Sequence, residues 1–78
     1  MYSALPAQII TIENAVAEAD VQGNRMRVDT SLLPEVQAGD HVLVQAGFVI
    51  SLITPEDFEA QQKIFHEITN NVRKALDA

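Results

Sequence analysis

Cysteine is absent from this sequence of 78 residues, and histidine occurs only twice, as His41 and His66. A chain without cysteine has no disulfide framework, no thiolate metal site and no cysteine nucleophile. The two histidines belong to no motif with the spacing of metal ligands. The composition therefore predicts that the chain has no metal site, and it argues against most redox and zinc-dependent functions.

Basic residues are scarce as well. Five of them stand against eleven acidic residues, which gives a formal net charge of −6. Arg25 and Arg27 flank Met26, and Lys63, Arg73 and Lys74 follow far downstream. Because nucleic-acid binding needs clustered cations to neutralise phosphates, the sequence predicts no nucleic-acid partner.

Long apolar runs are missing too. No stretch reaches the roughly 18 apolar residues that span a bilayer, and the N-terminus lacks the basic start of a signal peptide. We therefore expect a cytoplasmic protein without a membrane partner. At this length, residues 1–78 should form one domain with a single small core.

Catalytic motifs are not found either. The serine and threonine hydroxyls stand in no nucleophile elbow, and Gly23, Gly39 and Gly47 are too far apart to make a phosphate-binding loop. The acidic residues from 56 to 59 are explained by the first turn of a helix, where negative charge is favourable. The sequence therefore predicts no catalytic residues and no enzyme.

What the chain does have is a β-rich pattern over residues 1–53. Residues 7–12 and 15–21 form a predicted hairpin, and the second of these segments alternates with a period of two. Residues 25–29 alternate charged and apolar side chains, which predicts a third strand. The apolar stretch 41–53 is broken at Gly47 and predicts either two strands or one sharply bent strand, with Gly47 at a bulge or corner. The expected fold is mainly β, a small five-stranded OB-like or SH3-like barrel.

The period changes at Thr54. Thr54 suits a helix N-cap and Pro55 the first helical position, and apolar residues then recur every three or four positions. The pattern predicts one C-terminal amphipathic α-helix over residues 54–77. The expected core comprises Ile9, Val28, Val42, Val44, Ile50, Phe65 and Ile68.

The N-terminal segment, Met1 to Pro6, is apolar where small domains usually have polar ends. Such a segment either packs on its own core or inserts into another protein, and the residue pattern leaves both readings open.

The order of these segments resembles the HypC/HupF family of hydrogenase maturation chaperones. The resemblance rests on residues 5–8, 27–29, 38–44 and 47–51, and it spans nearly the whole chain. It implies a barrel followed by a helix, and a protein that binds partners and does not catalyse. The implied partners are a HypD-like maturation protein or the large-subunit precursor of a metalloenzyme.

Two positions depart from the family pattern. The family has a cysteine after the initiator methionine, which by resemblance handles an iron with cyanide and carbon monoxide ligands, and here that position is Tyr2. The family's histidine in the fourth strand segment corresponds to Gln45. A phenol and an amide are poor ligands for low-spin iron, so we expect no cofactor.

The resemblance implies a partner-binding surface at one end of the barrel. Its expected residues are Met1, Tyr2, Ser3, Ala4, Leu5, Pro6, Gln45, Gly47 and Phe48. The first hypothesis is therefore a HypC-like accessory chaperone that binds its partner without carrying iron. The alternative is a structural or assembly subunit that associates through the C-terminal helix, with homo-oligomers as one outcome.

Overall fold

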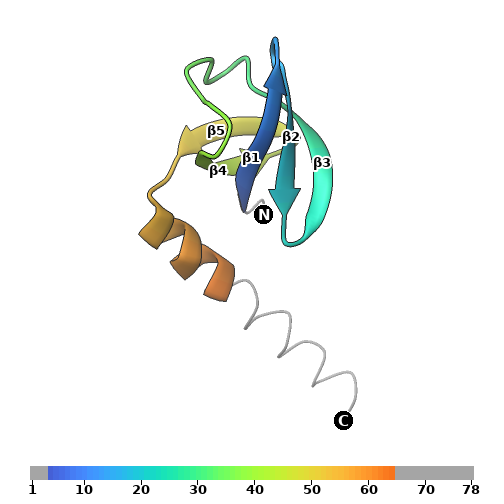
Figure 1. Ribbon diagram of the computed structural model, residues 1–78. Coiled ribbons are helices and arrows are strands. Elements are labelled where there is room, and N and C mark those ends of the chain that lie inside the picture. The colour runs from blue at the N-terminus through green and yellow to red at the C-terminus, as the bar shows by residue number, and fades with distance from the viewer. Residues whose placement is uncertain (1–3, 65–78) are drawn as a thin grey trace.

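The computed structural model describes residues 4–64, which form five strands and the start of a helix (Figure 1). The predicted core residues Phe65 and Ile68, and the helix over 65–77, lie outside the described residues. The strands are β1 (Leu5–Glu13), β2 (Val16–Val21), β3 (Asn24–Asp29), β4 (His41–Gln45) and β5 (Phe48–Leu52).

The strands close into a barrel in the order β1-β2-β3-β5-β4, with β4 pairing back onto β1. The first half of β1 pairs with β4 and its second half with β2, and a register shift after Ile9 bends the strand between the two. β3 and β5 run parallel and share a single register pair, Asp29 with Phe48. Of the two expected barrel types, this closed strand order is the OB-like one.

The barrel interior is filled mainly by small side chains. Its buried apolar residues are Ala7, Ile9, Ala17, Ala19, Val21, Val28, Val36, Val42, Val44 and Val49. Alanine and valine suffice because five strands enclose little space. The alternation predicted for residues 15–21 is confirmed from Ala17 onward, and Ile9, Val28, Val42 and Val44 are buried as predicted.

Two expectations for these strands were wrong. Ile50 is 39% exposed and does not belong to the core, because the register shift between β4 and β5 pairs Val44 with Val49 and leaves Ile50 on the outer face without a partner. Ala15 does not face inward, because the first hairpin turns at residues 14–15 and Ala15 lies exposed in that turn.

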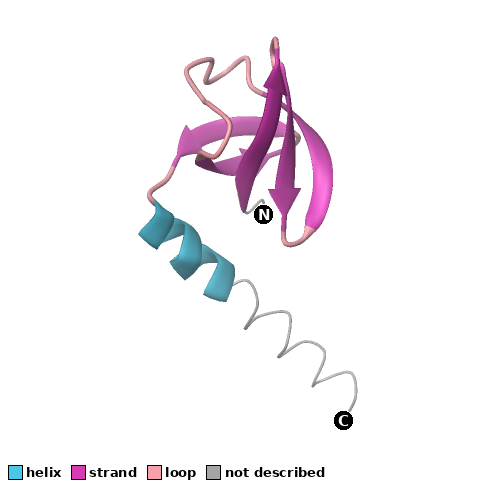
Figure 2. Ribbon diagram, in the orientation of Figure 1, coloured by secondary structure: helices cyan, strands magenta, loops and turns pink. Residues whose placement is uncertain are grey.

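The helix begins at residue 55, as the sequence predicts, and continues to the end of the described part (Figure 2). Thr54 caps it, since its hydroxyl oxygen accepts a hydrogen bond of 3.0 Å from the backbone N–H of Asp57. Phe58 packs against His41 with ring centroids 4.4 Å apart. This contact joins the first turn of the helix to the beginning of β4.

Candidate functional site

The strand pairing brings most of the predicted partner-binding residues to one end of the barrel. Leu5, at the start of β1, lies opposite Val44, next to the end of β4. Gln45 lies opposite Phe48 across the β4–β5 hairpin. We call this surface the N-terminal rim, and define it as Ala4, Leu5, Gln45, Gly47 and Phe48.

The hairpin turn at the rim has a fixed backbone shape. Ala46 and Gly47 both have positive φ, 54° and 82°, as a two-residue type I′ turn requires. The carbonyl of Gly47 accepts a 2.8 Å hydrogen bond from the backbone N–H of Asp29. This bond ties the turn to β3 and holds Phe48 beside it.

The rim residues differ in how much of each reaches solvent. Phe48 is 38% exposed, whereas Ala4, Leu5, Gln45 and Gly47 are partly buried. Pro6 is buried and pairs with Leu43, so it shapes the start of β1, and its contribution to partner binding stays a prediction. A proline fits there because the pairing of β1 with β2 begins only at Gln8.

Met1, Tyr2 and Ser3 lie outside the described residues. The direction of β1 nevertheless means that the chain enters the barrel at the N-terminal rim, next to the β4–β5 turn. The contribution of these three residues to the site stays a prediction.

The rim offers poor ligands for a metal. Within residues 4–64, no group of three or more His, Cys, Asp or Glu side chains could hold an ion. Gln45 supplies a neutral amide, and His41 lies at the other end of β4 against Phe58. The residues described at the rim therefore do not fit an iron that prefers thiolate and imidazole ligands.

Sequence reasoning missed Asp29, which joins β3 to the rim. Its carboxylate accepts a 2.7 Å hydrogen bond from the backbone N–H of Ser31. Hydrogen bonds from the side chain and the backbone of Ser31 lower the pKa of Asp29 below its ordinary value. The Arg-Met-Arg-Val-Asp alternation predicted a strand here, but nothing in the pattern showed that β3 would end against Gly47.

An open hollow of about 430 Å³ lies on the barrel wall, lined by Thr11, Glu13, Asn14, Val16, Ala17, Glu18 and Arg27. It has no histidine or cysteine among its lining residues, and none of its lining residues belongs to the N-terminal rim.

Within the described part of the chain, no helix is long and apolar enough to cross a membrane.

A closed five-stranded barrel with an apolar rim at the chain's entry point defines a small OB-like barrel protein. The family model described as the HupF/HypC family matches residues 1–65, and the chain therefore belongs to this family. The chain is also 29% identical over 69 residues to the hydrogenase maturation factor HypC of Cupriavidus necator. That alignment covers 87% of this chain and 77% of the relative.

Proposed function

We propose that this protein is an accessory chaperone of hydrogenase maturation, which binds a protein partner through the N-terminal rim and does not carry iron itself. The observation that carries the proposal is the family match over residues 1–65, which includes every residue of the rim. The relative from Cupriavidus necator supports the same pathway by its name.

The shape of the rim suits this role. The rim exposes an aromatic side chain, Phe48, beside an amide, Gln45, and aromatic residues contribute strongly to protein–protein binding. The backbone around Phe48 is held on both sides, by the pairing with β4 and by the hydrogen bond from Asp29 to Gly47. A surface fixed before binding loses little conformational entropy when a partner arrives.

The partner class follows from the family. We propose a HypD-like maturation protein, or the large-subunit precursor of the hydrogenase, acting in the cytoplasm. In this scheme the protein binds and releases its partner, and it catalyses no reaction.

Replacing Phe48 with alanine tests the rim. We expect the affinity for the purified HypD-type protein or the precursor to fall by about 10- to 30-fold, because an exposed aromatic anchor is lost. Isothermal titration calorimetry measures the change. The variant should remain folded with a modest loss of thermal stability, because part of the Phe48 side chain is exposed to solvent in the parent.

Leu32→Ala is the matched control. Leu32 is 63% exposed, lies in the connection between β3 and β4, and is not one of the rim residues. We expect parent-like affinity for this variant. Equal losses for both variants would contradict a rim-centred interface, and self-association of the parent without binding to either protein would favour the assembly-subunit hypothesis.

The absence of iron is a separate prediction. The protein purified anaerobically from cells with active hydrogenase maturation should contain far less than one iron per chain, because the sequence has Tyr2 and Gln45 where the family has cysteine and histidine. Elemental analysis by mass spectrometry provides the measurement. About one iron per chain, retained through gel filtration, would contradict the proposal and indicate ligands outside the described residues.

A further inference from the structure

Among the residues that the structure describes, one side of β3 has no strand beside it over most of its length. β3 pairs with β2 along residues 24–29, but its pairing with β5 is limited to Asp29 with Phe48. Within residues 4–64, no other backbone segment bonds to residues 24–28 on the far side. We call this side of β3 its open edge.

The turn between β2 and β3 determines which backbone groups face the open edge. Gln22 and Gly23, with φ of 55° and 86°, form a two-residue turn, so that Val21 and Asn24 are the first hydrogen-bonded pair. Hydrogen-bonded and non-hydrogen-bonded pairs then alternate along the antiparallel strands. The pairs at Met26 and Val28 are bonded to β2, whereas the N–H and C=O groups of Arg25 and Arg27 face away from it.

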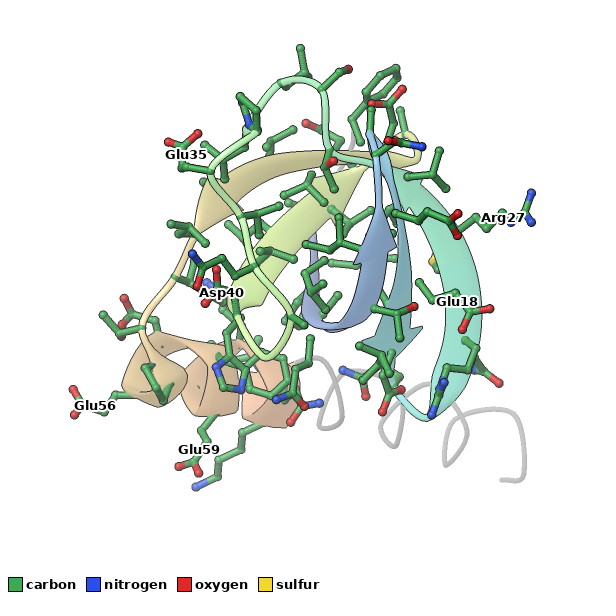
Figure 3. The ribbon with its side chains drawn as sticks, turned by 45° about the horizontal axis from the view of Figure 1, so that its top comes forward. Glu18, Arg27, Glu35, Asp40, Glu56 and Glu59 are labelled. Atoms are coloured by element: carbon green, nitrogen blue, oxygen red, sulfur yellow. The ribbon has the colours of Figure 1, made fainter. Side chains whose placement is uncertain are left out.

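Two arginine side chains lie at the open edge, and each is opposite an acidic residue of β2, Arg25 opposite Asp20 and Arg27 opposite Glu18. Arg27 points outward from β3 in Figure 3, and Glu18 lies on the neighbouring strand. Arg25 makes an ion pair of 3.6 Å with Glu18, both side chains being more than half exposed. Arg25, Arg27 and Lys63 are the only lysine or arginine residues in the described part of the chain. The net charge of the full chain is −6.

An apolar side chain accompanies them. Met26 lies opposite the buried Ala19 and therefore belongs to the inner face of the barrel, yet it is 37% exposed. In residues 4–64, no strand lies beside it on the side of β3 away from β2. The open edge thus combines unpaired backbone groups, an uncovered apolar side chain and two cations, and it begins where Asp29 meets Phe48 of the N-terminal rim.

We propose that an extended acidic segment of the maturation partner adds as a further strand to the open edge of β3. Its backbone would bond to the N–H and C=O groups of Arg25 and Arg27, as in other cases of strand addition to a sheet edge. Acidic side chains opposite the two arginines would give favourable cross-strand pairs, and the segment would cover Met26. The inference rests on the proposed function, since it names the part of the partner that continues the contact beyond the rim.

Amide hydrogen exchange of the full chain tests the proposal directly. In the free protein, the amides of Arg25 and Arg27 should exchange much faster than those of Met26 and Val28, which are bonded to β2. Saturation with the purified HypD-type protein should slow exchange at Arg25 and Arg27 at least about tenfold. Slow exchange at both residues in the free chain would overturn the proposal, because a segment of the chain itself or a second copy would then cover the edge.

Two substitutions at one position separate backbone pairing from charge. Arg27→Gln removes the charge and keeps the N–H, and we expect about a fivefold loss of affinity. Arg27→Pro removes the outward N–H as well while leaving the pairing with β2 in place, and the loss should be at least about tenfold greater than for the glutamine variant. Arg25→Pro provides the same comparison if the first proline variant does not fold by circular dichroism.

The two levels of the proposal fail differently. If the partner binds the parent but the amides of Arg25 and Arg27 remain fast in the complex, or if the proline and glutamine variants bind equally, the strand-addition inference is wrong while rim binding stands. If neither the HypD-type protein nor the precursor binds the parent, the proposed function itself is wrong.

Discussion

Replacing Ile9 with alanine is expected to lower the free energy of unfolding by about 2 to 5 kcal/mol. Ile9 is 1% exposed and is one of the largest fully buried side chains of the described part of the chain. The strands around it are bonded to one another, so they cannot collapse into the space that the missing atoms leave. Urea denaturation followed by circular dichroism gives the change in stability.

Ile50→Ala is the control, because it removes the same atoms from a residue that is 39% exposed. Its cost should be smaller, about 1 kcal/mol, since part of the Ile50 side chain is already in water and no closed cavity is left. If both variants lose the same stability, then Ile50 packs inside the barrel and the inner face of β5 is assigned wrongly.

Ile50 also shows where sequence patterns stop being informative. The sequence of residues 48–52 does not show which face of the strand points into the barrel. Phe48, Ile50 and Leu52 on one face are apolar, and so is Val49 on the other. The structure buries Val49 and exposes the other three, and the register shift between β4 and β5 contributes to this choice. A register shift depends on pairing between strands and leaves no mark in a single strand's composition.

Other elements were predictable because local chemistry determines them. The helix start at residue 55 follows from Thr54 as the cap and Pro55 as the first helical residue. The β4–β5 hairpin follows from the glycine in the middle of an apolar stretch, since Gly47 adopts the positive φ of the turn. The closed strand order required contacts between distant segments, and the sequence had left OB-like and SH3-like barrels open.

The candidate site was predictable only through the family resemblance. From residue chemistry alone, the apolar N-terminal segment could either pack on its own core or insert into another protein. The family resemblance predicted that it forms one binding surface with Gln45, Gly47 and Phe48. The pairing of Leu5 with Val44 and of Gln45 with Phe48 brings the start of β1 next to the β4–β5 hairpin, and the binding role of these residues stays a prediction. The open edge of β3 could not be foreseen, because it results from the divergence of β3 and β5 after one register pair.

Gln45 stands where the family has a histidine, and this difference affects iron handling and partner binding in different ways. Gln45 remains partly buried in the hairpin next to Phe48, so the rim keeps a hydrogen-bonding side chain at this position. An amide can still donate to and accept from a partner's backbone, although it neither titrates nor binds iron well. Under the proposed function, partner binding at this surface would therefore use hydrogen bonding and apolar contact and would not require the ligands that hold iron.

The small residues of the barrel interior lead to the second prediction on stability. Ala19 is fully buried and lies directly opposite Ile9 on the neighbouring strand, so a large and a small side chain share one space. Ala19→Ile adds atoms to a closed interior, and we expect it to lower the free energy of unfolding by about 1 to 3 kcal/mol. Combining it with Ile9→Ala exchanges the two side chains across the pair and conserves their total volume.

The double variant should therefore be more stable than the sum of the two single losses predicts, by about 1 to 2 kcal/mol, because the new isoleucine occupies the cavity that Ile9 leaves. Denaturation of the parent, both single variants and the double variant completes the cycle. Simple additivity would mean that the two side chains do not share a space, and the register of Ile9 with Ala19 would then be incorrect. Coupling of the expected sign would support the β1–β2 pairing that continues, through the hairpin at Gly23, into β3 and its open edge.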